Sequence, residues 1–230
     1  MPVLARFAGP NGKISVVEDP STGARLYLEG GVTQSCVLPG GEAGVAYIRL
    51  MAALLAERAN VLLLGCGGGA LATMLHHRAS RVTVVEVNPI SFQLARTFFW
   101  MPDGIECITA DMRQFARTQT RSFDAIGIDV GGSCFAYAEV LEPATIARLR
   151  RALRAGGRIA VNISLEAPDD PMPGRIADRL KAEGLDVWAF RENSTSDELN
   201  VVILASARRE TPSALSGLAE ESWSLARLTA

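Results

Sequence analysis

A cluster of glycines at 65–69, Gly-Cys-Gly-Gly-Gly, is the part of this sequence best suited to hold a ligand. A short apolar run at 61–64 precedes it and predicts a buried strand, and the segment 70–78 after it predicts a helix. A strand, a glycine-rich turn and a helix in this order cradle nucleotide-like ligands, because glycine lets the backbone turn sharply and approach the ligand closely. The start of the helix also presents unpaired N–H groups to the ligand.

A carboxylate follows at the spacing that such a site uses. Glu86 ends a second apolar strand, 82–87, about 20 residues after Gly65. An acidic side chain at the tip of that strand accepts hydrogen bonds from both hydroxyls of a ribose. The glycines and Glu86 together predict a binding site for a ligand that contains a nucleoside.

Composition narrows the kinds of partner. The chain has 230 residues, of which 48% are hydrophobic and 21% are charged, and its net charge is −2. A large core is therefore expected, and neither nucleic acid nor an acidic membrane is expected as a partner. No apolar run reaches the roughly 18 residues of a membrane span, and the N-terminus lacks the apolar stretch of a signal peptide. We expect a cytoplasmic protein.

Neither metal binding nor cysteine chemistry is predicted. The four cysteines are far apart in the sequence, and the only histidines, His76 and His77, are adjacent. Neighbouring positions of a helix point about 100° apart, so this pair would chelate a metal poorly. Cys66 and Cys134 flank the expected ligand site, but no histidine near either one in sequence marks it as a nucleophile.

The order of the expected elements indicates an α/β fold. Strands that alternate with helices form a parallel sheet with helices on both faces. Only about ten residues separate the last two strands, and a parallel connection needs about a dozen or more, so the last strand is expected to run antiparallel. The prediction is a Rossmann-like, seven-stranded, mostly parallel sheet. Its strands are expected near 61–65, 82–87, 105–109, 124–129, 157–163, 185–191 and 200–206, and its helices near 70–78, 90–99, 143–154 and 174–183.

A small β module precedes this sheet. Residues 13–38 contain three short segments with strand character, separated by turn residues, and a helix near 43–58 leads into the sheet. We therefore divide the chain into an N-terminal β-hairpin module at 1–40, a ligand-binding Rossmann-like domain at 41–208 and a tail at 209–230. The tail is rich in Ser, Glu and Ala, and we expect a loose helix or no fixed structure there.

The glycine loop and the antiparallel last strand resemble the class I S-adenosylmethionine-dependent methyltransferases. The resemblance implies that Thr109–Met112 is the adenine element, in which the Asp carboxylate accepts from the exocyclic amine and the next side chain packs on the ring. It also implies that Phe123–Asp129 is the fourth-strand motif. The cofactor-binding residues that it implies are Gly65, Cys66, Gly67, Gly69, Glu86, Val87, Asp111, Met112 and Asp129.

A closer resemblance, over about residues 13–206, is to the spermidine synthase (aminopropyltransferase) family. The hairpin module, the segment Leu28–Gln34 and Tyr47 ahead of a helix carry it. It implies that Gln34 hydrogen-bonds the methionine part of the cofactor and that Asp129 is the catalytic residue that accepts a proton from an amine. The residues alone leave alternatives open, since Gln34 can be a polar residue of an edge strand and Asp129 a cap of the next loop.

The sequence departs from that family where the family binds the aminopropyl group of its donor and its diamine. Gly68 stands at the position of an Asp that, in the family, holds the aminopropyl end of decarboxylated S-adenosylmethionine, and Gly132 stands at the position of the second carboxylate of the fourth-strand motif, which binds the diamine. Ile48 replaces a His, and Arg191–Ser196 replaces a Tyr-Pro segment. A diamine is doubly charged at neutral pH, and enclosing it without paired carboxylates is costly. The loop carboxylates that could replace them are Glu42, Glu139 and Glu142.

The expected function is that of a spermidine-synthase-like transferase. It binds S-adenosylmethionine or decarboxylated S-adenosylmethionine and a small-molecule substrate, and it releases S-adenosylhomocysteine or methylthioadenosine; the missing carboxylates argue against genuine spermidine synthesis. Three alternatives remain: a small-molecule methyltransferase, a non-catalytic nucleoside-binding module and a nicotinamide-dependent oxidoreductase, which the antiparallel strand and Asp111 disfavour. The apolar run Phe98–Met101 is expected in the core, with a homodimer contact as the alternative.

Overall fold

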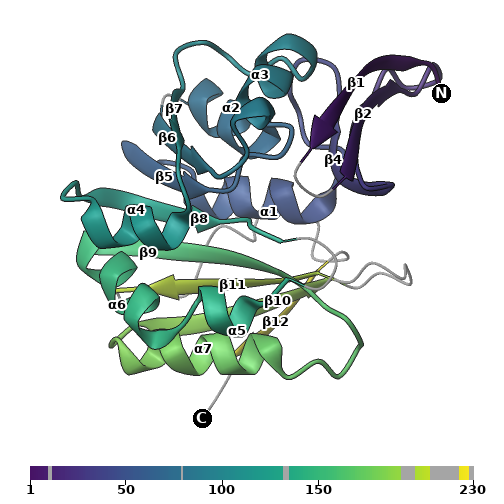
Figure 1. Cartoon of the computed structure of the whole chain (residues 1–230). Coiled ribbons are helices and arrows are strands. Elements are labelled where there is room, and N and C mark those ends of the chain that lie inside the picture. The colour runs from purple at the N-terminus through teal and green to yellow at the C-terminus, as the bar shows by residue number, and fades with distance from the viewer. Residues whose placement is uncertain (10–11, 79, 132–134, 193–199, 208–222, 228–230) are drawn as a thin grey trace.

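The protein contains two β-sheets, as a computed structural model shows (Figure 1). The structure describes residues 1–9, 12–78, 80–131, 135–192, 200–207 and 223–227. The N-terminal sheet is antiparallel, and its strands follow one another in space as in sequence. They are β1 (Val3–Gly9), β2 (Gly12–Glu18), β3 (Arg25–Glu29) and β4 (Val32–Val37).

Three strands of this sheet, β2 to β4, are those that the sequence predicts, and β1 is an addition. The residues of β1 are exposed or half-buried, with no buried face. A strand of this kind lacks the alternation of buried and exposed residues by which strands are recognised in a sequence.

The main sheet has eight strands in the order β12–β10–β11–β9–β8–β5–β6–β7. Parallel pairing joins the five strands from β9 to β7, and β11 runs antiparallel to both β9 and β10. The predicted seven strands and the antiparallel last strand are therefore confirmed. The strands are β5 (Asn60–Leu64), β6 (Arg81–Glu86), β7 (Glu106–Thr109), β8 (Phe123–Ile128), β9 (Leu153–Ser164), β10 (Asp186–Glu192), β11 (Asn200–Ser206) and β12 (Trp223–Arg227).

The eighth strand, β12, corrects the prediction made for the tail. It pairs antiparallel with β10 at the edge of the sheet, whereas the sequence predicts a loose helix or no fixed structure. Without β12, β10 would expose a row of unpaired N–H and C=O groups. Pairing satisfies those groups, and the local composition of the tail carries no sign of this long-range effect. The tail residues 209–222 and 228–230 lie outside the described residues.

Seven helices lie within the described part of the chain and cover both faces of the main sheet (Figure 1). Leu63 of β5 packs with α1 to α3, whereas Leu62 and Leu64 pack with α4, α6 and α7, because successive side chains of a strand point to opposite faces. Both α4 and the short α5 are additions to the predicted helices. The helices are α1 (Ala46–Leu55), α2 (Ala70–His77), α3 (Pro89–Phe98), α4 (Met112–Thr118), α5 (Tyr137–Val140), α6 (Pro143–Ala152) and α7 (Met172–Ala182).

The N-terminal sheet packs into the same core as α1 to α3. Its buried side chains Ile14, Val16, Tyr27 and Val37 belong to the hydrophobic cluster that these helices form with the main sheet. This packing fixes the position of β4 relative to the main sheet.

The end of α3 and the segment that follows it contact the N-terminal sheet. The guanidinium of Arg25, on β3, donates to the carbonyl of Phe98 over 2.6 Å and lies 4.3 Å from the ring centroid of Trp100. Phe99 and Met101 are buried, so the expectation that this apolar run lies in the core is confirmed for both.

Two kinds of feature are absent from the part of the chain that the structure describes. No helix there is long and apolar enough to cross a membrane. No group of three or more His, Cys, Asp or Glu side chains there is placed to hold a metal ion.

Candidate functional site

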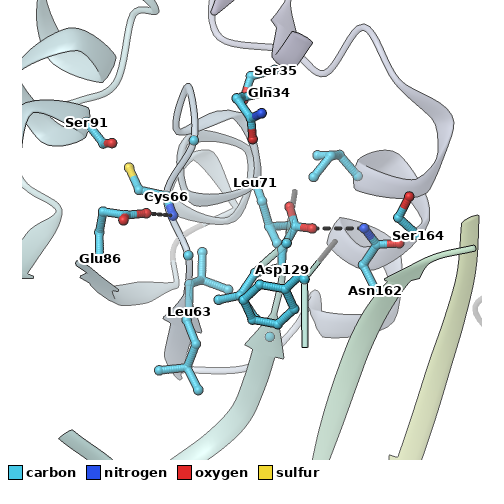
Figure 2. A pocket seen from close by; sticks show the side chains of 18 of the residues that line it. Gln34, Ser35, Leu63, Cys66, Leu71, Glu86, Ser91, Asp129, Asn162 and Ser164 are labelled. Carbon is cyan, nitrogen blue, oxygen red and sulfur yellow. Dashed lines mark hydrogen bonds between the residues drawn. The ribbon is translucent and has the colours of Figure 1, made fainter. Parts of the chain in front are cut away.

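A cleft lies where the main sheet reverses its strand order. β6 lies on one side of β5 and β8 on the other, and ligands of open α/β sheets bind outside the C-terminal ends of the strands at such a point. The cleft here has a volume of about 770 Å³, within the range of ligand-binding pockets. Its walls come from β4, the glycine loop, the ends of β6, β8 and β9 and the start of α4 (Figure 2).

The glycine loop has the backbone that the sequence predicts. Gly65 adopts φ +100°, and a Cβ there would lie only 2.0 Å from the carbonyl oxygen of Asp129. Its N–H donates to the carbonyl of Val85 over 2.9 Å, so the loop is anchored to the neighbouring strand β6. Gly67 adopts φ +51°, and a Cβ there would lie 2.5 Å from Ser35 Oγ. Both positions therefore require glycine.

Gly69 is the one predicted cofactor-binding residue that does not line the cleft in the described structure. It starts α2 with φ +77° and lies behind the loop, where a Cβ would be 2.9 Å from Met101 Sδ. Its physical role is to begin the helix, because few other residues adopt this left-handed backbone.

Glu86 is held rigidly at the tip of β6. Its Oε2 accepts the N–H of Cys66 over 3.0 Å, and its Oε1 accepts the N–H of Asn88 over 2.8 Å. Each oxygen keeps a second acceptor position, so the carboxylate can still receive two hydroxyl groups. Val87, which follows it and lines the cleft, is 66% exposed.

Asp111 and Met112 are adjacent residues at the start of α4. The Oδ1 of Asp111 caps this helix by accepting the N–H groups of Arg113 and Gln114, each over 3.0 Å. No described residue hydrogen-bonds its Oδ2, which is left to accept from a ligand. Met112 is buried and lines the cleft beside it.

Strand β4 covers the glycine loop from the N-terminal sheet. The hydroxyl of Ser35 accepts the N–H of Gly68 over 2.8 Å, and the carbonyl of Gln34 lies 3.9 Å from where a Cβ of Gly67 would be. The side chain of Gln34 lines the cleft (Figure 2). Gln34 therefore lies beside the glycine loop, where it can reach a ligand in the cleft.

Asp129 lies beyond the end of β8, on the far side of the loop from Glu86 (Figure 2). Its backbone N–H donates to the carbonyl of Leu64 over 2.9 Å, and its Oδ1 accepts from Asn162 Nδ2 over 3.0 Å. Burial raises the pKa of Asp129 to about 6, and the hydrogen bond from Asn162 opposes this rise. A carboxylate with this pKa is ionised at neutral pH and accepts a proton readily.

The thiol of Cys66 lines the cleft next to Glu86 (Figure 2). Burial, and to a lesser degree the charge of Glu86, raises the pKa of this thiol well above its usual value. The thiol therefore stays protonated at neutral pH. Cys134 lies outside the described residues.

Comparison with known proteins identifies the architecture. Residues 61–157 match the sequence profile of a family described as a methyltransferase domain. A solved structure of a probable spermidine synthase from Corynebacterium glutamicum ATCC 13032 superposes with a TM-score of 0.79 at 19% identity, covering 92% of this chain and 82% of that chain. The chain has the spermidine-synthase-like fold of class I S-adenosylmethionine-dependent methyltransferases.

Two further structures share this spermidine-synthase-like fold. A spermidine synthase in complex with the transition-state analogue AdoDATO has a TM-score of 0.70 at 17% identity, covering 90% of this chain and 74% of that chain. The spermidine synthase of Thermotoga maritima has a TM-score of 0.69 at 18% identity, with the same coverages. No curated protein sequence matches the chain. At these identities the likeness establishes the fold alone.

The described lining of the cleft is acidic and contains no Lys, Arg or His. Of the six carboxylates in this lining, the sequence predicts Glu86, Asp111 and Asp129 but not the other three. Neither Glu42 nor Glu139 nor Glu142, the candidates for replacing the family's carboxylates, lines the cleft. The six carboxylates that do so are Glu29, Glu86, Asp111, Asp129, Glu166 and Asp170.

The end of the cleft beyond Asp129 was also missed. It is formed by Tyr137 of α5, by Asn162 and Ser164 of β9, and by the segment that leads into α7. The hydroxyl of Tyr137 accepts the N–H of Ser164 over 3.2 Å. One signal for Asn162 is present in the sequence, since it is a polar residue within the apolar run Ile159–Ile163 of a predicted strand.

The environment of Gly68 decides whether an Asp can be restored there. Gly68 is buried, and a Cβ would lie 2.9 Å from Val37 Cγ2 and 3.1 Å from Ser35 Cβ. The position therefore points toward β4 and is absent from the cleft lining. Gly132, the other position without its family carboxylate, lies outside the described residues.

Gly68→Asp is expected to destabilise the fold without restoring a diamine site. The side chain collides with β4, and its carboxylate is buried without a cation, so we expect the free energy of unfolding to fall by roughly 2–4 kcal/mol, measured by urea denaturation. Gly174→Asp is the matched control, because a Cβ there meets nothing within 4 Å; its effect should be within about 0.5 kcal/mol. Wild-type stability of Gly68→Asp would mean that the side chain turns into the cleft.

Proposed function

We propose that this protein is a transferase that uses a sulfonium donor, preferably decarboxylated S-adenosylmethionine, to alkylate an amine. The observation that carries the proposal is the charge of the cleft, which has six carboxylates and no cationic side chain in its described lining. Such a cleft attracts a positively charged donor and a positively charged acceptor.

The residues at one end of the cleft fit the nucleoside of this donor. Glu86 keeps one acceptor position on each oxygen for the ribose hydroxyls, and Asp111 keeps Oδ2 for the exocyclic amine of adenine. Gly65 and Gly67 line the cleft and have no side chain, so the loop backbone itself can contact the ligand. Buried Met112 offers an apolar surface for the ring.

Charge also supports a preference between the two donors. Decarboxylated S-adenosylmethionine has a sulfonium and an ammonium group, whereas S-adenosylmethionine adds a carboxylate. That carboxylate would face a lining without Lys, Arg or His among the described residues. Two carboxylates about 5 Å apart repel by roughly 3 kcal/mol at an effective dielectric constant of about 20. We therefore expect the decarboxylated donor to bind at least about tenfold more tightly.

The chemistry asks little of the protein beyond positioning and one proton acceptor. The donor supplies a carbon already activated by its bond to positively charged sulfur. The protein holds the nucleoside through Glu86 and Asp111 and places the amine in line with that carbon. As the C–N bond forms and the C–S bond breaks, Asp129 accepts the proton that the amine loses. The thioether that leaves, methylthioadenosine, is neutral, so the acidic lining attracts it less than the donor.

Calorimetric titration with decarboxylated S-adenosylmethionine, S-adenosylmethionine and methylthioadenosine tests this proposal. All three should bind, the decarboxylated donor most tightly. Glu86→Ala should weaken methylthioadenosine binding by roughly 1–3 kcal/mol, because it removes the ribose acceptor and leaves the backbone N–H groups of Cys66 and Asn88 unpaired. Glu139→Ala is the matched control, since Glu139 is exposed and does not line the cleft.

The titration separates the alternatives. Failure of every adenosyl ligand to bind would overturn the proposed function, and binding of NAD in their place would move the chain to the oxidoreductases. Equal affinity for both sulfonium donors would remove the donor preference. Unchanged affinity of Glu86→Ala would remove the assignment of Glu86 to the ribose.

A further inference from the structure

We propose that the acceptor is a primary amine with an apolar tail, held by Asp129 and Asn162. This inference rests on the proposed function and adds the chemical class of the second substrate. It starts from a buried polar atom without a partner, Asn162 Oδ1, and from the apolar wall beyond it.

The register of the sheet places the two side chains next to each other. β8 pairs with β9 so that Ile128 is opposite Val161, and the next residue of each segment is Asp129 and Asn162. Asn162 Nδ2 donates to Asp129 Oδ1 over 3.0 Å (Figure 2). An ionised carboxylate can only accept, so the amide must turn its nitrogen toward Asp129 and its oxygen away.

The oxygen of Asn162 is one of several buried side-chain atoms of the described residues that have no hydrogen-bond partner. The side chain is only 6% exposed, it lines the cleft, and its Oδ1 accepts no hydrogen bond. A buried acceptor without a donor costs free energy, and most such groups in native proteins have a partner. A ligand that donates hydrogen bonds to this place satisfies Asn162 Oδ1 and Asp129 Oδ2 together.

A primary amine matches this pair. One N–H of the neutral amine can donate to the oxygen of Asn162 and another to Asp129, while the lone pair on nitrogen attacks the activated carbon. As the C–N bond forms and the C–S bond of the donor breaks, Asp129 takes the proton that the nitrogen loses, and methylthioadenosine leaves. An alcohol has a single O–H donor, so it leaves one of the two acceptors unpaired.

The wall beyond this pair is apolar where a diamine would need a second carboxylate. Tyr137 and Phe135 form an edge-to-face pair with ring centroids 4.8 Å apart, and the lining continues with Val140, Leu165 and Met172. Phe135, Val140, Leu165 and Met172 are partly buried side chains at the margin of the core. An alkyl or aryl tail gains contact with them, whereas a second ammonium would lose its hydration there.

The two acidic residues near this wall do not form a second ammonium site. Both oxygens of Asp170 accept backbone N–H groups, from Met172 over 2.8 Å and from Glu166 over 3.3 Å, so these peptide dipoles already offset part of its negative charge. Glu166 is exposed and lies at the rim of the cleft, where water competes for its charge. Asp129 is therefore the carboxylate that faces the reacting nitrogen.

The first test measures amine binding to the full chain saturated with methylthioadenosine. Calorimetry should show hexylamine binding at least about tenfold more tightly than putrescine, and 1-hexanol binding more weakly than hexylamine. With decarboxylated S-adenosylmethionine, hexylamine should yield its N-aminopropyl product, detected by mass spectrometry. Methylthioadenosine binding together with a preference for putrescine, or with no hexylamine binding, would overturn this inference and leave the proposed function standing. Absence of methylthioadenosine binding would instead overturn the proposed function.

Two substitutions of Asn162 distinguish the role of its amide oxygen from that of its amide nitrogen. Asn162→Ala removes both and should weaken hexylamine binding about 10- to 100-fold. Asn162→Asp keeps an acceptor for the amine, so binding should stay within about threefold of wild type. In both variants kcat/KM should lose activity at a higher pH than in the wild type, because the donor that lowers the pKa of Asp129 is gone. The other titratable groups that line this side of the cleft are Tyr137, Glu166 and Asp170, and none of them is changed.

Met172→Glu tests the wall without touching the amine pair. Met172 lies in the first turn of α7, where a Glu is compatible with the helix. The new carboxylate should lower the preference for hexylamine over putrescine by at least about tenfold. Unchanged discrimination in Met172→Glu, or unchanged hexylamine affinity in a folded Asn162→Ala protein that still binds methylthioadenosine, would overturn the inference.

Discussion

Asp129→Asn is expected to lower turnover by about 10²- to 10⁴-fold while methylthioadenosine binds within about twofold of the wild type. Asparagine has nearly the same size and keeps the neighbouring contacts of the loop, but it cannot accept the proton that the amine loses. The side chain of Asp129 lies on the far side of the loop from Glu86 (Figure 2), so the ribose contact stays intact. The rate of methylthioadenosine release from decarboxylated S-adenosylmethionine measures the effect.

The pH dependence of the wild type gives a second readout of the same role. Burial raises the pKa of Asp129 to about 6, so its ionised, proton-accepting form is lost as the pH falls through that value. We expect kcat/KM to decrease below about pH 6 and to be independent of this carboxylate above it. Asp103→Asn is the matched control, because the side chain of Asp103 is 98% exposed. More than a tenth of wild-type turnover in Asp129→Asn would exclude Asp129 as the proton acceptor.

The nucleoside half of the site could be predicted because each of its residues follows a strand that the sequence predicts. The glycine loop, Glu86 and Asp111 each stand at the C-terminal end of a strand, and the first two of these strands, β5 and β6, are largely buried runs with clear boundaries. Parallel strands bring such ends to one edge of a sheet. The alternation of strands and helices therefore determined both the fold and the position of these residues.

The acceptor half could not be predicted, because it depends on pairing between distant segments. Asn162 comes next to Asp129 only through the register of β8 and β9, and Tyr137 belongs to a four-residue helix with no periodic pattern. For the aminopropyl end of the donor, the resemblance placed a carboxylate position at Gly68, but the backbone directs that position toward β4. Motif matching reports which residue is present and not the direction in which it points.

The N-terminal sheet shows the same limit of prediction from sequence. Its strands β2 to β4 were predicted, and the closeness of Gln34 to the glycine loop followed from the resemblance. Glu29, a buried carboxylate of β3, also lines the cleft and accepts from the hydroxyl of Tyr27 over 3.2 Å. Its inward direction depends on how the sheet packs on α1 to α3, which the alternation within one strand does not specify.

Gly65→Ala is expected to have the largest effect on the fold and on donor binding together. A Cβ at this position would lie 2.0 Å from the carbonyl oxygen of Asp129 and 2.8 Å from its carbonyl carbon, so two backbone segments have to separate. The backbone at φ +100° is also strained for any residue with a side chain. We expect the free energy of unfolding to fall by roughly 2–5 kcal/mol and methylthioadenosine binding to be lost.

Thermal denaturation and calorimetry measure the two effects, and Gly174→Ala provides the matched control. Gly174 lies in α7, is exposed, and has nothing within 4 Å of its added Cβ. Alanine there should leave stability unchanged or raise it by up to about 1 kcal/mol, because it favours the helix. Because the added Cβ collides with the backbone of Asp129, Gly65→Ala should disturb both donor binding and the position of the proton acceptor. A Gly65→Ala protein with wild-type stability and donor affinity would show that the loop does not pack against β8 in this way.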